Sequence, residues 1–208
     1  MKIKVCGLKD PENIKAISAL SPDYMGFICY GLSPRFIAEL EPEVLEALPD
    51  TVYKTAVFVN ESKATIDNLI NQFDFNAIQL HGDESPEFSQ SFKPKVKVFK
   101  AFGVDDDFDF NQLGVYADSV DYFMFDTKTE GYGGSGRAFN WNILENYTLD
   151  KPFFICGGIS LDNLERIAEI KHPRFYGVDL NSRFETEPGK KDVQKLTKAF
   201  EILRQSIT

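Results

Sequence analysis

Residues 54–82, KTAVFVNESKATIDNLINQFDFNAIQLHG, contain one complete strand–helix–strand unit. The runs at 54–59 and 77–81 are short and mostly apolar, which is typical of strands buried on both faces. Between them, Ser62 is expected to cap a helix, because the apolar residues that follow recur at helical spacing: Ile66, Leu69, Ile70 and Phe73. Two strands joined through a helix are expected to run parallel.

The same alternation of strand and helix continues along the whole chain. Eight runs are predicted to be strands, with starts roughly 20 to 30 residues apart: 3–6, 24–29, 54–59, 77–81, 96–101, 122–126, 152–156 and 175–180. Helices are predicted after Asp10, at 43–48, after Ser62, after Ser85, from Ser160 and at 192–207. The segment 105–117 is the weakest unit, and we expect its helix to be short or irregular.

Strict alternation of this kind predicts a parallel sheet with right-handed crossovers. Eight units in 208 residues match an α/β fold consisting of a single (β/α)8 TIM barrel over residues 1–208, since this fold needs about 200 residues. The alternative is an open doubly wound sheet. Such sheets usually have five or six strands and a glycine-rich first turn, whereas the first turn here reads Cys6-Gly7-Leu8. The sequence therefore favours the barrel.

Composition limits the partners and the cellular location. The 23 basic and 32 acidic residues give a net charge of −9, which argues against a nucleic acid or a membrane surface as partner. The 3 cysteines and 2 histidines predict neither a disulfide framework nor a zinc site. With no signal-peptide pattern at the start and no apolar stretch of about 20 residues, we expect a cytoplasmic protein.

In a barrel, catalytic residues lie where the strands end and on the loops that follow. The predicted strand ends bring Cys6, Cys29, His81, Asp126 and Cys156 to one rim. A thiol and a carboxyl group on this rim could act as a base and an acid, although free cysteine is more often a small buried apolar residue. His81 is either a base or a structural hydrogen-bonding residue. Asp179 lies inside the last strand and is expected to be structural.

The loops around this rim suggest an anionic ligand. Gly157 and Gly158 follow the seventh strand and lead towards a predicted helix start, where backbone N–H groups can bind phosphate. The loop with Asn181 and Ser182 follows the eighth strand, beside it. Arg35, after the second strand, carries a planar fork that matches a carboxylate. Residues 131–137, which include Gly133 and Gly134, are predicted to form a mobile lid.

A set of motifs in this chain, taken in order, resembles the phosphoribosylanthranilate isomerase family of tryptophan biosynthesis. The matching segments cover essentially the whole chain and are KVCGL at 4–8, GF at 26–27, SPR at 33–35, VFVN at 57–60, IQLHGDE at 78–84, FD at 125–126, GGSG at 133–136, FNW at 139–141, GGI at 157–159 with Asn163, and GVD at 177–179 with Ser182, Glu185, PG at 188–189 and KD at 191–192. Each motif alone is weak, but the ordered set is specific.

The resemblance implies a barrel of the ribulose-phosphate-binding type and an Amadori rearrangement of N-(5'-phosphoribosyl)anthranilate. By resemblance, Asp126 is the general acid, Cys6 is the general base and Arg35 pairs with the anthranilate carboxylate. Gly158 and Ser182 hold the phosphate, and the loop with Gly133 and Gly134 closes over the site. His81, Gly157 and Asn181 are also expected to contact the small phosphorylated substrate. No metal or other cofactor is expected.

One position departs from the family pattern. The family usually has Ser-Ser-Gly-Val-Glu after the eighth strand, whereas this chain has Asn181-Ser182-Arg183-Phe184-Glu185. Arg183 either adds a cationic contact to the phosphate or points outward while its amide keeps the family's role.

Other functions fit the residues less well. The histidine-pathway isomerase uses two aspartates, whereas the first strand here ends in Cys6. We find neither the early lysine and glutamate of indoleglycerol-phosphate synthase nor the metal-binding histidines of a ribulose-phosphate epimerase. A non-catalytic phosphate-binding protein would be expected to lack Cys6 or Asp126. The acidic surface favours a monomer, with a homodimer as the alternative.

Overall fold

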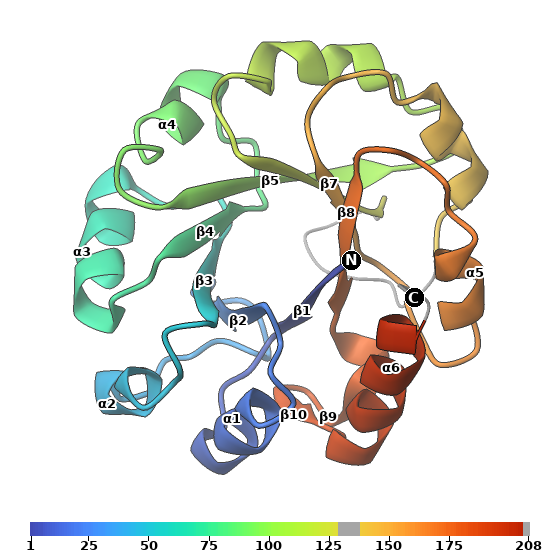
Figure 1. Ribbon diagram of the computed structural model, residues 1–208. Helices are drawn as coiled ribbons and strands as arrows, with labels where there is room; N and C mark the ends of the chain where they lie inside the picture. Colours follow the sequence, from blue (N-terminus) through green and yellow to red (C-terminus); the bar gives the residue numbers. More distant parts are fainter. Residues whose placement is uncertain (129–137, 206–208) are drawn as a thin grey trace.

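A computed structural model describes residues 1–128 and 138–205 of the chain. Eight parallel strands form a closed barrel in sequence order, with the last strand paired to the first (Figure 1). The strands are β1 (Lys2–Cys6), β2 (Tyr24–Ile28), β3 (Tyr53–Phe58), β4 (Ala77–Leu80), β5 (Lys97–Val104), β6 (Tyr122–Thr127), β7 (Phe153–Ile155) and β8 (Phe175–Leu180). This confirms the predicted barrel and excludes the open sheet.

Helices surround the strands in a ring (Figure 1). The α-helices are α1 (Pro11–Ser18), α2 (Pro42–Glu46), α3 (Lys63–Phe73), α4 (Pro86–Gln90), α5 (Leu164–Ala168) and α6 (Val193–Gln205). The predicted caps of α1, α3 and α4 are confirmed, because the side chains of Asp10, Ser62 and Ser85 each accept a backbone N–H three residues later. The weak segment after β5 forms the 3-10 helix η1 (Phe110–Tyr116), and η2 (Trp141–Asn146) follows β6.

The helix predicted to begin at Ser160 was placed wrongly. Residues 161–163 form a turn, and α5 begins only at Leu164. The side chain of Asn163 accepts the N–H of Ser160 and donates to the carbonyl oxygen of Gly158. This side chain therefore stabilises a turn where the sequence suggested the first turn of a helix.

Two groups of buried side chains hold the barrel together. The larger lies between the strands and the outer helices. The smaller fills the interior with Tyr24, Ala77, Phe99, Ala101, Met124, Phe154 and Cys156. Tyr24 and Tyr122, which packs against this cluster, are the first residues of their strands. The barrel is therefore packed solid towards the N-terminal ends of its strands, and a ligand site can form only at the other end.

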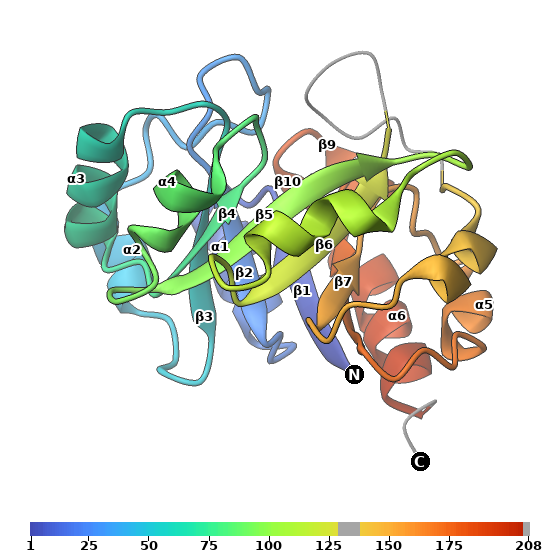
Figure 2. The same ribbon diagram turned by 90° about the horizontal axis from the view of Figure 1, so that it is seen from above.

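A small hairpin stands at that other end. The 3-10 turn η3 (Ser182–Phe184) follows β8 and leads into the antiparallel pair β9 (Glu185–Glu187) and β10 (Lys190–Lys191). In the side view the hairpin lies at the end of the barrel opposite the N-terminus (Figure 2). In the described part of the chain, no helix has the length and apolar character needed to cross a membrane.

Candidate active site

A cavity of about 350 Å³ opens at the C-terminal ends of the strands. Its wall includes these predicted site residues: Cys6, Arg35, His81, Asp126, Gly157, Gly158, Asn181 and Ser182. Arg183 is exposed and borders a neighbouring hollow together with Gly158 and Lys195. Gly133 and Gly134 lie outside the described residues. The topology thus gathers side chains that are up to 176 residues apart in sequence, from Cys6 to Ser182.

Two polar residues that precede the predicted site residues by two positions also face inward, and the sequence analysis did not assign them to the site. Alternate residues of a strand share a face. Gln79 therefore points inward with His81, and Asp179 points inward with Asn181; all four line the cavity. The sequence pattern that could have identified them is a polar residue two positions before each predicted site residue at a strand end. Asp179, which was expected to be structural, pairs with Lys4 and is also part of the cavity wall.

Cys6 is the last residue of β1, and its thiol is buried against β2. Its partner in the sheet is Gly26, where an added Cβ would stand 2.6 Å from the Cys6 sulfur. The missing side chain therefore provides the space for the thiol. Burial raises the pKa of Cys6 and the nearby Asp179 carboxylate adds to the rise, while the Lys4 ammonium group lowers it and limits the rise.

Lys4 is a fully buried cation, two residues before Cys6 on β1. Its Nζ lies 2.9 Å from Oδ2 of Asp179 on the neighbouring strand β8. Burial alone would lower the pKa of Lys4, but the charges of Asp179 and Cys6 outweigh this and raise it. Lys4 is therefore protonated at neutral pH and places a positive charge beside the thiol.

We expect this buried ion pair to matter for stability. Changing Lys4 to Met should cost about 3–5 kcal/mol of unfolding free energy, because it leaves the Asp179 carboxylate buried without its counter-ion. Denaturant unfolding measures this, and the double variant Lys4→Met/Asp179→Asn should recover much of the loss. A matched control is Lys54→Met, which removes a pair with the 89% exposed Asp74 and should cost about 1 kcal/mol or less. Equal losses in both single variants would contradict this account.

The other two cysteines lack this setting. Burial raises the pKa of Cys29 to about 12, and this residue is not part of the cavity wall. Cys156 does line the cavity, but burial and the negative charges of Asp126 and Asp179 raise its pKa well above the usual value. Cys6 is thus the cysteine best placed to ionise towards a ligand.

Asp126 lies near the end of β6, three strands from Cys6 around the barrel by way of β7 and β8. Burial raises the pKa of its carboxyl group to about 6, and Asp179 adds to the rise, while the backbone N–H of Thr127 opposes it. That N–H donates to Oδ1 over 2.8 Å. The shifted pKa suits a group that must deliver a proton near neutral pH.

His81 stands beside Asp126, with 3.5 Å between its Nε2 and Oδ2 of the carboxyl group. Burial lowers the pKa of His81 to about 4, and the charges of Lys100 and Lys4 add to the fall. The imidazole is therefore neutral at pH 7 and a poor proton acceptor. Its Nδ1 lies 3.0 Å from Nε2 of Gln79, so the ring is placed as a hydrogen-bonding group.

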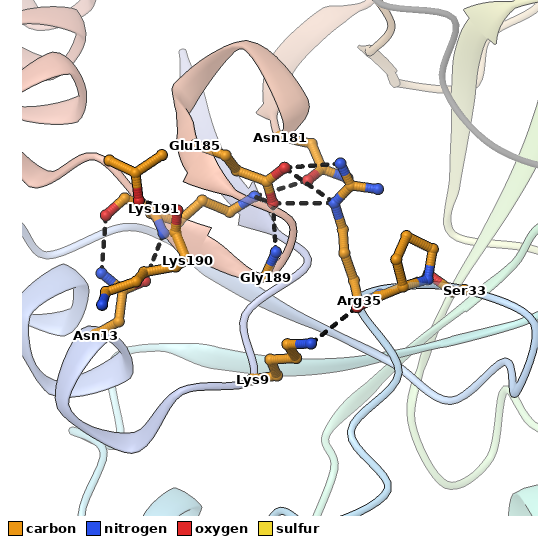
Figure 3. A network of polar contacts seen from close by, with 11 residues as sticks. Lys9, Asn13, Ser33, Arg35, Asn181, Glu185, Gly189, Lys190 and Lys191 are labelled. Atoms are coloured by element: carbon orange, nitrogen blue, oxygen red, sulfur yellow. Dashed lines mark hydrogen bonds and ion pairs between the residues drawn. The ribbon is translucent and has the colours of Figure 1, made fainter.

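Arg35 is held in an ion network that joins the loop after β2 to the hairpin after β8 (Figure 3). Its Nε and Nη2 both contact the Glu185 carboxylate, the closest pair being 2.7 Å apart. Lys191, which is buried, donates to the same carboxylate over 2.6 Å and to Oδ1 of Asn181 over 2.7 Å. The network fixes the direction of the Arg35 side chain before any ligand arrives.

The loop after β7 gives its backbone to the cavity. Gly157 and Gly158 have φ angles of +76° and +63°, which side-chain-bearing residues rarely adopt. An added Cβ at Gly157 would also collide with Oδ1 of Asp126. The sequence predicted that the N-terminus of the next helix would supply anion-binding N–H groups. However, α5 is short and begins only at Leu164, six residues after Gly158, so it does not supply them here. The remaining candidates are the amides of the loop itself.

No group of three histidine, cysteine, aspartate or glutamate side chains within residues 1–128 and 138–205 is arranged to hold a metal ion.

Comparison with known sequences identifies the relatives of this chain. The family model for N-(5'-phosphoribosyl)anthranilate (PRA) isomerase matches residues 3–202. The enzyme of that name from Parabacteroides distasonis is 43% identical over 94% of this chain and 90% of its own length. The one from Phocaeicola vulgatus is 41% identical over the full length of both chains.

Solved structures agree with the sequence comparison. Phosphoribosyl anthranilate isomerase from Thermus thermophilus superposes with a TM-score of 0.85 at 27% identity and covers 99% of both chains. Another phosphoribosyl anthranilate isomerase was solved in complex with reduced 1-(o-carboxyphenylamino)-1-deoxyribulose 5-phosphate. It superposes with a TM-score of 0.81 at 25% identity, again over 99% of both chains.

Proposed function

The chain belongs to the N-(5'-phosphoribosyl)anthranilate isomerase family, and from this membership we propose how its own residues carry out the reaction. The substrate is an aminoaldose that carries a phosphate and an anthranilate carboxylate. The product is the aminoketose 1-(2-carboxyphenylamino)-1-deoxyribulose 5-phosphate, formed in tryptophan biosynthesis. The rearrangement moves protons and opens a sugar ring without net oxidation, so the chemistry can be done by one acid and one base.

Asp126 is the acid in this proposal. Its proton goes to the furanose ring oxygen, the bond from that oxygen to C1 breaks, and the nitrogen lone pair forms a protonated, positively charged Schiff base between C1 and the anthranilate nitrogen. The pKa of about 6 supports this role, because a carboxyl group at its ordinary value would hold far fewer protons at pH 7.

Cys6 is the base. As a thiolate it takes the proton from C2, and the electrons of the C–H bond neutralise the Schiff base to give an enolamine. The enolamine then becomes the ketone by gaining a proton at C1 and losing the hydroxyl proton at C2. Lys4 supports this role, because its charge favours the thiolate over the thiol.

The two ends of the substrate have separate sites in this proposal. Arg35 pairs with the anthranilate carboxylate; its Nε and Nη2 face Glu185, so the substrate approaches the remaining edge of the guanidinium group. Backbone amides around Gly158 and Ser182 bind the phosphate, with Gly157, Asn181 and His81 in the wall around the sugar. Arg183 borders the phosphate end. Gly133 and Gly134 are proposed to close over the ligand.

The observation that carries this proposal is that Cys6, Asp126 and Arg35 line one cavity whose volume falls within the range of small-molecule sites. The direct test is turnover of freshly formed N-(5'-phosphoribosyl)anthranilate by the purified protein, followed as appearance of the aminoketose. The histidine-pathway aminoaldose serves as the comparison substrate. Turnover of that compound alone, or of neither compound, would reject the proposal.

We expect Arg35→Lys to raise KM by about 10- to 100-fold with a smaller change in kcat, because a lysine cannot present the same fork to a carboxylate. Steady-state kinetics measure both parameters. Arg174→Lys is the matched control, since Arg174 pairs with Asp150 and lies before β8, at the other end of the barrel. A fall in kcat at unchanged KM would place Arg35 in the chemical step instead.

The location and assembly of the protein remain predictions. We propose a cytoplasmic monomer; the enzyme from Thermotoga maritima, in contrast, is described as a dimer from which monomers were generated. Size-exclusion chromatography with light scattering would distinguish the two states.

A further inference from the structure

Gln79, His81 and Asp126 form a line of polar contacts across the floor of the cavity. Gln79 and His81 point inward from the end of β4, and Asp126 comes from β6. The amide Nε2 of Gln79 lies 3.0 Å from Nδ1 of His81, and Nε2 of His81 lies 3.5 Å from Oδ2 of Asp126. Gln79 is almost completely buried, so its side chain has little freedom to turn elsewhere.

The direction of the Gln79 amide decides which imidazole nitrogen carries the proton. An amide NH2 group can only donate, so Nδ1 of His81 must accept and hold no proton. A neutral imidazole has one N–H group, which then lies on Nε2 and faces Asp126. The charges around the ring agree with a neutral imidazole, because Lys4 of β1 and Lys100 of β5 both disfavour a second proton on it.

The two oxygens of the Asp126 carboxyl group thereby face different N–H groups, one hydrogen-bonded and one 3.5 Å away. The Thr127 backbone N–H donates to Oδ1, and the Nε2–H group of His81 faces Oδ2. An N–H donor stabilises a carboxylate more than a carboxylic acid, so the Thr127 hydrogen bond does this already and the His81 N–H group would do so by moving slightly closer. Their effect grows as Asp126 loses its proton, which is the step in which the sugar ring opens.

The other end of the Gln79 amide is enclosed by the protein. Its Oε1 is buried and has no hydrogen-bond partner among the described residues. Because protein atoms cover it, this oxygen is not presented to a ligand, and the effect of Gln79 on the reaction is expected to pass through His81.

We propose that Gln79 is a positioning residue for the isomerisation, holding His81 as the Nε2–H tautomer so that His81 donates to the Asp126 carboxylate as it forms. This inference rests on the proposed function, in which Asp126 is the acid. Gln79 acts through His81, and its effect is therefore expected in kcat, with little effect on KM.

The variant Gln79→Glu tests this, because it keeps the shape of the side chain and replaces the donor with an acceptor. The new carboxylate would accept from Nδ1–H and move the proton of His81 away from Asp126. We expect kcat to fall about 10- to 100-fold while KM changes less than about threefold. Gln79→Met, which removes the donor without adding charge, should also lower kcat. Gln90→Glu, on the exposed side of α4, is the matched control for the added charge and should leave both parameters unchanged.

Nitrogen NMR of the histidine side chains gives a second readout that does not depend on activity. The chain has 2 histidines, so His172→Asn assigns the signals of His81. We expect the Nε2–H form in the wild type and the Nδ1–H form in Gln79→Glu. The inference would be overturned if the His81 tautomer is the same in Gln79→Glu as in the wild type. It would also be overturned if the wild type is active and both Gln79 variants keep its kcat. A wild type that does not turn over the substrate would instead reject the proposed function, and the two failures are thus distinguishable.

Discussion

Changing Asp126 to Asn is expected to lower kcat for N-(5'-phosphoribosyl)anthranilate by about 10²- to 10⁴-fold, the usual contribution of a general acid. The amide has nearly the same shape as the carboxyl group, and it can still accept the Thr127 N–H that Oδ1 accepts now. It cannot deliver a proton to the ring oxygen. Steady-state turnover measures the loss, and circular dichroism checks that the barrel is intact.

The pH profile of kcat/KM makes this prediction specific to Asp126. The reactive form needs Asp126 protonated and Cys6 ionised, but the pKa of the acid, about 6, lies below the raised pKa of the base. Below pH 6 the acid is protonated, so activity rises with pH as more thiolate forms. Between the two pKa values the gain in thiolate cancels the loss of protonated acid, and the profile is flat. Above the pKa of Cys6 it falls.

Removing the acid changes the shape of that profile. In Asp126→Asn the residual activity should keep rising with pH through 6 until Cys6 is ionised, because only the base still titrates. Asp50→Asn, at an exposed loop position, is the control and should retain the plateau. Residual activity that levels off near pH 6 in Asp126→Asn would mean that another group has this pKa and that Asp126 is not the acid.

Cys6→Ser is expected to cause a loss of similar size, about 10²- to 10⁴-fold in kcat, because a hydroxyl group ionises far less readily than a thiol. The substitution is nearly isosteric in the pocket beside Gly26, so substrate binding and KM should change little. Steady-state kinetics at several pH values measure the effect.

The two other cysteines supply matched controls for Cys6. Cys29→Ser replaces a thiol that is equally buried but lies outside the cavity wall, and it should keep kcat within about twofold. Cys156→Ser replaces a thiol inside the cavity whose pKa is raised well above the usual value. Full activity of Cys6→Ser, or an equal loss in Cys156→Ser, would remove Cys6 from its role as the base.

Much of the barrel could be predicted because its signals are local. Each strand is a short apolar run, and caps such as Asp10 and Ser62 act within three residues of the helix start. The error at Ser160 has a local cause too: Asn163 uses its side chain to hold a turn, and the helix after it has only 5 residues. Neither fact follows from the apolar spacing that suggested the helix.

The site could be predicted only in part, because its electrostatics depend on contacts between distant segments. Arg35 and Glu185 are 150 residues apart, so the network that fixes the guanidinium group is invisible in the sequence. The partner of Lys4, Asp179, is 175 residues away. Gln79 could have been predicted as a site residue, since a glutamine two residues before His81 in a buried strand must share its inward face. Gly133 and Gly134 lie outside the described residues, so their part in the site stays a prediction.

A crystal structure of this chain with the reduced product analogue bound tests the central claim most directly. We predict that the Cys6 sulfur lies against C2 of the ligand and that Asp126 lies within hydrogen-bond reach of the oxygen that closed the furanose ring. The ligand carboxylate is expected at Arg35, and its phosphate at the two loops that contain Gly158 and Ser182. A ligand bound elsewhere, or one whose C2 and former ring oxygen are out of reach of Cys6 and Asp126, would contradict the account.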